Sequence, residues 1–338
     1  MPAGDGPVTL TSNQQPDACD SHQPSPRRTI KISGGADYWT FTGLNIVHGA
    51  YLNGKGAGAA YSWRASMIKA GNWQARRAVP GTSQNDPTAA AGVPAYLANL
   101  LGTPMDPNEG IKFINNRFTS RGIYTTLASS GTIKDNTFTD IICGSGPAVW
   151  VMTFSNFWEI TGNDITKVAT SAYKHYMQEG IRIDVAANYN HIANNNVHDM
   201  AGDARGINSD VEASFNVFEN NRVSNVAIAY NDQMAGWGNT WRNNVGTGYR
   251  TYCMGFRLKD APFTAPSMNS STNMANVYGN TCAAPATTGV KAIGIGAIMN
   301  STFNANAVSG VMLGKYVASY WAAYGNTWNG SSTPPPVK

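Results

Sequence analysis

Two aspartates, Asp184 and Asp210, occupy the same place in two copies of one short sequence unit. The first copy begins at Gly180 and reads Gly-Ile-Arg-Ile-Asp-Val. The second begins at Gly206, 26 positions later, and reads Gly-Ile-Asn-Ser-Asp-Val. Two carboxylates brought side by side repel each other unless a cation or a proton intervenes. The pair is therefore a candidate calcium site, a candidate acid and base for catalysis, or a solvated pair of charges.

Both copies alternate apolar and polar residues, which is typical of short β-strands with one buried face. Inward side chains are expected at Ile181, Ile183, Val185, Ile207, Ser209 and Val211. Stacking of the two strands in register at about 4.8 Å places Arg182 beside Asn208 and Asp184 beside Asp210. We therefore expect these four polar side chains on one outer face.

The same alternation extends this outer face in both directions along the chain. Its predicted row comprises Tyr124, Trp150, Arg182, Asp184, Asn208, Asp210, Arg257 and Lys259. Aromatic rings followed by acids and bases suit a sugar polymer, whose rings pack on aromatic faces and whose hydroxyls need polar partners. The candidate substrate-binding residues are Tyr124, Trp150, Asn208, Arg257 and Lys259.

The segment that leads into the first of the paired strands supplies further candidates from the rim. The candidate catalytic residues are Arg182, Asp184, Asp210, Lys174, His175 and Glu179. Calcium is the candidate cofactor, bound by Asp184 and Asp210. The alternative interpretation, without catalysis, is an ion pair between Arg182 and Asp184.

A recurring phrase of Asn, any residue and an apolar residue gives the architecture. It recurs at Asn116, Asn136, Asn163, Asn195, Asn221, Asn239, Asn280, Asn306 and Asn326. The units are too short for strand–helix–strand crossovers, so stacked coils of short strands, a parallel β-helix, fit best. Each Asn is expected to bond the backbone at a bend and the Asn of the next coil.

Three parts of the chain are expected: an N-terminal segment over 1–28, the β-helix over 29–330 and a tail over 331–338. Insertions near 48–109 and 251–275 interrupt the repeat of the Asn phrase, and the first is predicted to contain one short helix. Its aromatic and basic residues either wall a groove or dock onto the coils. They are Tyr61, Trp63, Arg64, Trp73, Arg76 and Arg77.

Composition excludes several classes of function. The formal net charge is +4 and no basic run is present, so nucleic acid is not an expected partner. No stretch reaches the roughly 18 apolar residues of a membrane span, and no signal peptide is visible. The four cysteines show no metal-ligand spacing. Buried free thiols are the default expectation, with a Cys253–Cys282 bridge as the alternative.

The phrase Gly-Ala-Asp-Tyr-Trp-Thr-Phe-Thr-Gly-Leu-Asn-Ile at 35–46, followed by the Asn repeats, resembles the right-handed parallel β-helix proteins of the pectate-lyase-like superfamily. The resemblance implies an all-β, single-stranded right-handed solenoid. In lyases of this superfamily outward acids bind calcium and an Arg or Lys abstracts a proton, roles that Arg182, Asp184 and Asp210 would suit. In its hydrolases two carboxylates act, here Asp184 and Asp210.

The expected function is cleavage of a polysaccharide bound along the outer face, by a lyase or by a glycoside hydrolase. The resemblance also covers bacteriophage tail spikes, so a non-catalytic glycan-binding or structural fibre is the alternative. The expected partner is a polysaccharide substrate or a surface glycan, and the expected location is extracellular or virion-associated. A monomer is expected for an enzyme, and a homotrimer for a phage fibre.

Overall fold

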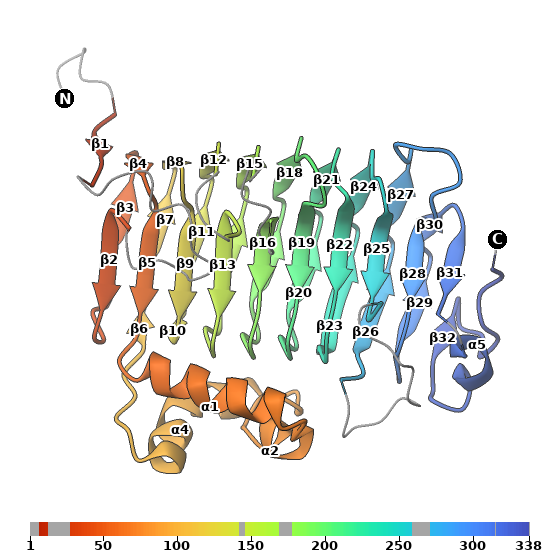
Figure 1. The fold of residues 1–338 in the computed structure, drawn as a ribbon, viewed down its shortest axis with the longest axis horizontal. Helices are drawn as coiled ribbons and strands as arrows, with labels where there is room; N and C mark the ends of the chain where they lie inside the picture. The colour runs from red at the N-terminus through yellow and green to blue at the C-terminus, as the bar shows by residue number, and fades with distance from the viewer. Residues whose placement is uncertain are drawn as a thin grey trace.

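The computed structural model describes residues 7–12, 28–141, 146–168, 178–258, 271–314 and 316–337. Over these residues the chain winds into a solenoid whose coils stack along one axis, from the N-terminus at one end to the C-terminus at the other (Figure 1). Three parallel sheets of ten strands each form its faces. The predicted parallel β-helix is therefore confirmed.

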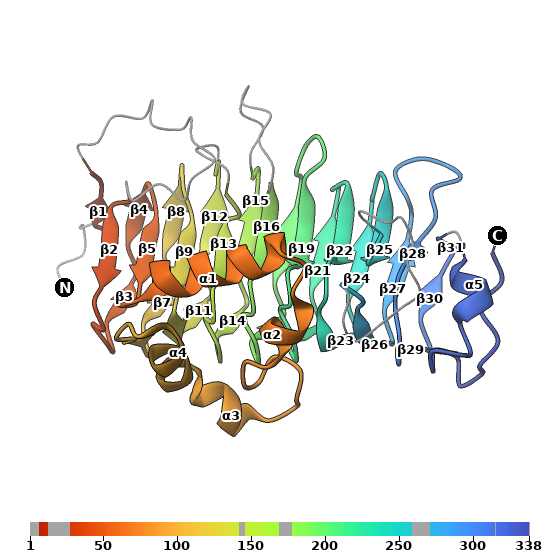
Figure 2. The ribbon, with the colours of Figure 1, turned by 60° about the horizontal axis from the view of Figure 1, so that its bottom comes forward.

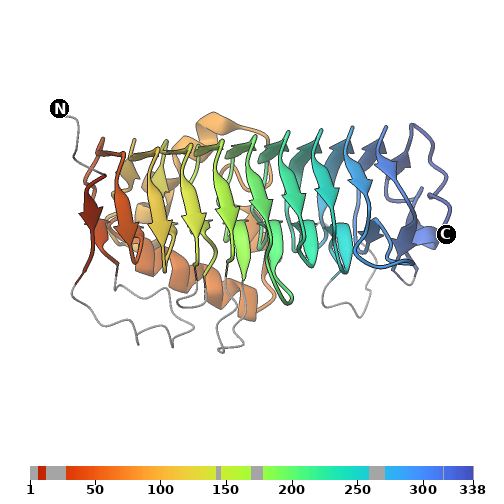
Figure 3. The same ribbon diagram turned by 90° about the horizontal axis from the view of Figure 1, so that it is seen from above.

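Each coil contributes one strand to each sheet, and the strands stack regularly when seen from above (Figure 3). The first sheet contains β2 (Ile30–Ser33), β5 (Ala50–Asn53), β9 (Ile123–Thr126), β13 (Val149–Met152), β16 (Glu179–Ile183), β19 (Arg205–Ser209), β22 (Ile228–Asp232), β25 (Tyr252–Phe256), β28 (Ile293–Ile295) and β31 (Val311–Leu313). This sheet carries the candidate site.

The other two sheets complete the coils. The second sheet contains β1 (Thr9–Leu10), β4 (Asn45–Val47), β8 (Arg117–Thr119), β12 (Thr137–Thr139), β15 (Asp164–Thr166), β18 (Asn196–His198), β21 (Arg222–Ser224), β24 (Val245–Thr247), β27 (Thr281–Ala283) and β30 (Ala307–Val308). The third sheet contains β3 (Thr40–Thr42), β7 (Lys112–Ile114), β11 (Thr132–Lys134), β14 (Glu159–Thr161), β17 (His191–Ala193), β20 (Val217–Glu219), β23 (Trp237–Arg242), β26 (Met274–Tyr278), β29 (Thr302–Asn304) and β32 (Thr327–Trp328). A small pair is formed by β6 (Asn108–Glu109) and β10 (Ala128–Ser129).

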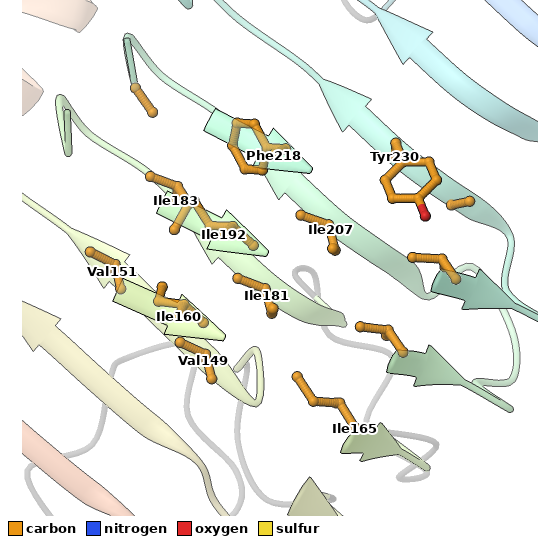
Figure 4. Close-up of a cluster of buried hydrophobic side chains, with 14 of the residues drawn as sticks. Val149, Val151, Ile160, Ile165, Ile181, Ile183, Ile192, Ile207, Phe218 and Tyr230 are labelled. Carbon is orange, nitrogen blue, oxygen red and sulfur yellow. The ribbon is translucent and has the colours of Figure 1, made fainter. Parts of the chain in front are cut away.

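Inward side chains of successive coils stack in register and form the core. Val149, Ile181 and Ile207 are aligned on β13, β16 and β19. They face other apolar side chains across the interior of the solenoid (Figure 4). Each buried side chain of this size stabilises the fold by about 1.5–3 kcal/mol relative to exposure. This packing explains why the period-2 pattern of the sequence located the strands.

A ladder of buried asparagines runs along one bend of the coils. Each side-chain amide donates to the Oδ1 atom of the Asn in the next coil. The members are Asn116, Asn136, Asn163, Asn195, Asn221, Asn244, Asn280 and Asn306. The prediction placed Asn239 and Asn326 in this ladder, and that was wrong for both. Asn326 accepts from the backbone N–H of Ser301 and donates to the Ile298 carbonyl. Asn239 belongs to a separate ladder with Asn190 and Asn216. Asn244 was missed because a Gly follows it at the expected apolar position.

The insertion after β5 forms four helices rather than the one short helix predicted. They are α1 (Ala57–Lys69), α2 (Trp73–Arg77), α3 (Pro87–Ala91) and α4 (Val93–Leu101), called the helical excursion below. The Asp86 side chain caps α3 by accepting from the backbone N–H groups of Thr88 and Ala89. Within the described residues, no helix has the length and apolar character needed to span a membrane.

The C-terminal coils carry two stabilising features. Cys253 and Cys282 form a disulfide, so the default expectation of free thiols was wrong for this pair and the alternative is confirmed. At the end of the stack, α5 (Val317–Tyr320) is followed by Trp321, which is fully buried beside Phe303. This aromatic contact covers the last apolar layer.

Candidate functional site

A groove of about 450 Å³ lies between α1 and the outer face of the first sheet. Its volume falls within the range of about 300–1,000 Å³ that is usual for ligand sites. The helix runs along the stack beside the strands of this sheet, as two views show (Figures 1 and 2). The groove is lined mainly by Tyr51, Tyr61, Tyr124, Trp150, Met152, Arg182 and Asp184. It is therefore elongated along the solenoid axis.

Aromatic rings form one end of the groove. Tyr51, Tyr124 and Trp150 are aligned on β5, β9 and β13. The centroids of neighbouring rings in this row are 5.0 Å apart. Tyr61 of α1 lines the same groove from the helix side. Tyr124 and Trp150 were predicted here, whereas Tyr51 was missed because its strand was included in the insertion. The alternation in Ala-Tyr-Leu-Asn at 50–53 was the available signal.

Charged residues form the other end, with Arg182 at their centre. Its Nε atom donates to Asp184 Oδ2 at 2.8 Å, and its Nη2 atom donates to Asp210 Oδ2 at 2.6 Å. Its Nη1 atom donates to both oxygens of Glu179, at 2.8 and 3.1 Å. All four side chains are buried. The predicted register of Arg182 with Asn208 is also present.

Burial and these contacts shift two pKa values. Burial opposes the charge of Arg182, but the carboxylates of Asp184, Glu179 and Asp210 outweigh it and hold the pKa of Arg182 well above its ordinary value. Burial raises the pKa of Asp210 to about 6, although Arg182 acts in the opposite direction. A guanidinium in this state binds and orients, and it does not suit the proton-abstracting base considered for a lyase.

The same geometry does not fit calcium at the aspartate pair. Each Oδ2 atom of the pair accepts from Arg182, and each Oδ1 atom accepts from the following backbone N–H, of Val185 or Val211. Calcium takes about 6–8 oxygen ligands, and a guanidinium between the carboxylates would repel it. Across the ranges that the structure describes, no three His, Cys, Asp or Glu side chains are grouped to hold a metal.

Asn208, a candidate for substrate binding, is buried outside the groove lining and donates from Nδ2 to Glu179 Oε1 at 2.9 Å. The predicted outer row needs two more corrections in the coils that follow. Strand β22 was not predicted, and it places Asn231 next to Asn208, whose Oδ1 atom accepts from the Asn231 side chain at 2.7 Å. Arg257 lies beyond the groove lining and donates from Nη2 to Ser271 Oγ at 2.6 Å. Lys174, His175 and Lys259 lie outside the described residues.

Val185 and Val211 were expected to point inward, but both line the groove. Their backbone φ angles are +45° and +30°, so the chain turns at these residues and the strand alternation ends. Such conformations are unusual for β-branched residues. The turns bring apolar side chains beside the acids and help to exclude water from them.

A sequence model described as a right-handed beta helix region matches residues 104–258. No curated protein sequence matches the chain. Among solved structures, the chain is similar to the periplasmic alginate epimerase AlgG, with 11% identity, 84% of this chain and 61% of that chain covered, and a TM-score of 0.38.

Two tailspike structures are also similar to this chain. The Dettilon tailspike protein is 12% identical, with 84% of this chain and 59% of that chain covered and a TM-score of 0.40. A double mutant of the tailspike protein of E. coli bacteriophage HK620 is 9% identical, with 91% and 65% covered and a TM-score of 0.38. This chain therefore spans less than two thirds of each of these structures, and at such values the likenesses carry no argument about chemistry.

Proposed function

Because the chain is a right-handed parallel β-helix protein, we propose that it binds an extended polysaccharide in the groove beside α1 and cleaves it by hydrolysis. One observation carries this proposal: a row of aromatic rings, Tyr51, Tyr124 and Trp150, leads directly to the Asp184 carboxylate in one groove. Arg182 joins this carboxylate to the buried Asp210 of the next coil. Flat aromatic faces offer large apolar contacts at little cost in conformational entropy. They suit the apolar faces of successive sugar rings.

In the proposed reaction Asp210 is the general acid and Asp184 the nucleophile, because carboxyl groups on neighbouring coils are too close to leave room for a water between them. Protonated Asp210 gives its proton to the glycosidic oxygen as the bond from that oxygen to the anomeric carbon breaks and Asp184 bonds to that carbon. Water then gives a proton back to Asp210, and its oxygen displaces Asp184 from the anomeric carbon. The products together contain one added water, and both carboxyl groups return to their starting state. The pKa of Asp210, near 6, keeps a useful fraction protonated close to neutral pH.

Hydrolysis is favoured over the lyase reaction by the charges of the groove. Three carboxylates converge on Arg182, and Arg205 also pairs with one of them, Glu179, at 3.4 Å. An anionic uronate would have to compete with these carboxylates for Arg182, so we propose a neutral polysaccharide as substrate. An extracellular or virion-associated location is part of this proposal.

The test is digestion of a panel of neutral and acidic polysaccharides, with and without a chelator. We expect new reducing ends from a neutral polymer, no ultraviolet-absorbing unsaturated products, and no effect of the chelator. Unsaturated products would identify a lyase and overturn the proposal. Binding without cleavage of any polymer would instead support the glycan-binding alternative.

The catalytic pair is tested with Asp184→Asn and Asp210→Asn. Each is expected to reduce turnover at least 100-fold, since an acid contributes about 10²–10⁴-fold and an amide is a poor replacement for a carboxylate nucleophile. Asp135→Asn is the matched control, because Asp135 is exposed and its ion pair with exposed Lys134 is 4.0 Å long. Folding of each variant is checked by circular dichroism, and full activity in both folded variants would remove this site.

A further inference from the structure

The turns after β9, β13, β16, β19 and β22 of the first sheet hold equivalent positions, and the first four of these positions present a side chain to the helical excursion. The backbone N–H groups of these positions bond successive coils in the same pattern. The positions are Leu127, Phe154, Ala186, Glu212 and Ala235, called the corner ladder below. All five are buried. Leu127, Phe154 and Ala186 pack with Ala57, Ala60 and other apolar side chains of the excursion.

Glu212 is the charged member of this otherwise apolar ladder. Its Oε2 atom lies 2.6 Å from Arg76 Nη2 and also pairs with Arg64 Nη2. Arg64 Nη1 donates to the backbone carbonyl of Arg76 at 2.9 Å, which links α1 to α2. The exposed fractions of the three side chains are 0%, 0% and 1%. The sequence alone allowed these arginines either to wall a groove or to dock onto the coils, and the structure shows that they dock.

A buried ion pair is an inefficient way to hold two surfaces together, because removing the charges from water offsets much of their attraction. Apolar contacts would dock the excursion as well, as they do at the neighbouring coils. Packing between alanine-rich surfaces has no preferred alignment, however. It therefore offers little resistance to sliding of α1 along the corner ladder. Hydrogen-bonded charges have one favourable alignment, and buried polar groups fix register in other helical packings.

We propose that Glu212 is a positioning residue: its ion pairs with Arg64 and Arg76 fix the register of α1 along the solenoid. Tyr61 lies one turn before Arg64 on the same helix and lines the groove together with Tyr124 and Trp150. The register of α1 therefore decides where Tyr61 stands relative to the aromatic row. This inference goes beyond the proposed hydrolysis and applies equally to a groove that only binds glycan.

The first test is Glu212→Gln, which keeps the shape of the side chain and removes its charge. Two buried guanidinium groups then lose their counter-charge, and hydrogen exchange of the α1 amides, residues 57–69, should accelerate at least tenfold. Exchange in β16 and β19 should not change. Glu219→Gln is the matched control, since Glu219 pairs with partly exposed Arg242 and His191 on the third sheet. Unchanged exchange in α1 of Glu212→Gln would overturn the proposal.

A second variant separates register from simple docking, and covers the case in which Glu212→Gln fails to fold. In Arg64→Met/Arg76→Met/Glu212→Leu the contact becomes apolar, so slow exchange in α1 should return. Spin labels at Lys69→Cys and Asn220→Cys, both exposed positions, then report the register. We expect one narrow distance distribution when Arg64, Arg76 and Glu212 are present, and a broadened or shifted one in the apolar triple variant. Identical distributions would show that the three charged residues dock α1 without fixing its register, which would overturn the proposal. Neither measurement needs a substrate, so failure of the proposed hydrolysis leaves this test intact.

Discussion

Arg182 Nη2 and Asp210 Oδ2 are 2.6 Å apart, and this contact joins two neighbouring coils of the first sheet. The same guanidinium also holds Asp184 and Glu179. Arg182 therefore pairs with three buried carboxylates, one of which, Glu179, also lies 3.4 Å from Arg205. The arrangement ties the stability of the stack to the candidate catalytic pair, and it leads to the first prediction.

Replacing Arg182 by Met should destabilise the folded protein by about 3–5 kcal/mol, the usual effect of removing one partner of a buried ion pair. Asp184 and Asp210 would remain buried without the Arg182 counter-charge, and Glu179 would keep only its longer contact with partly exposed Arg205. Arg242→Met is the matched control, since the Arg242 side chain is 39% exposed and an exposed pair contributes roughly 0–1 kcal/mol. Denaturant unfolding of both variants measures the difference. Equal destabilisation of the two would contradict this account of Arg182.

Activity should fall as pH rises through about 6, because burial raises the pKa of Asp210 to about 6 and the proposed acid must be protonated. Above that pH, kcat/KM is expected to decrease about tenfold per pH unit. Measuring kcat/KM on a neutral polysaccharide between pH 4 and 8 checks this decrease. A rate independent of pH across this range would remove Asp210 from the acid role.

From the buried Asp232 carboxyl we expect a separate effect of pH on the stability of the folded protein. It faces into the solenoid, where its Oδ1 atom accepts from Asn273 Nδ2 at 2.8 Å and its Oδ2 atom accepts from Trp241 Nε1 at 3.0 Å. Burial raises its pKa to about 7, above the unfolded value of about 3.9. The folded state thus holds the proton more tightly than the unfolded state. The resulting stability is complete below about pH 4 and is lost as pH rises to 7.

We therefore expect Asp232 to make the wild-type protein roughly 2–4 kcal/mol more stable at pH 4 than at pH 8. Asp210 titrates in an overlapping range, so the comparison must be with Asp232→Asn, which keeps Asp210. The variant should show a shallower dependence of unfolding free energy on pH. Parallel curves for the two proteins would show that Asp232 does not titrate in this range.

The sequence was sufficient for the fold because the coils repeat local signals. Alternation located β16 and β19, and the 26-residue offset placed Asp184 level with Asp210. Strand β22 was missed because no glycine precedes its apolar run. Without that coil, Arg257 was placed one step too near the site.

Contacts between segments far apart in sequence had no such signal. Glu212 meets Arg64 across 148 residues, and neither strand period nor Asn spacing relates an insertion to the coil on which it lies. Glu179 was a candidate because it leads into the first of the paired strands, and it is the first residue of β16. Its bidentate bond with Arg182 depends on side-chain directions that alternation does not specify.

Trp150 should contribute to binding more than to turnover. Its ring packs 5.0 Å from Tyr124 in the aromatic row, whereas its Nε1 atom is 3.4 Å from Asp184 Oδ2, a long hydrogen bond. Trp150→Phe keeps an aromatic face and is expected to change KM less than threefold. Trp150→Ala removes that face and should raise KM at least tenfold, in line with about 1–3 kcal/mol for a lost stacking partner, while kcat changes less. Steady-state kinetics on the cleaved polymer separate the two constants. A loss confined to kcat in Trp150→Ala would place the ring with the reacting bond instead of the bound sugar.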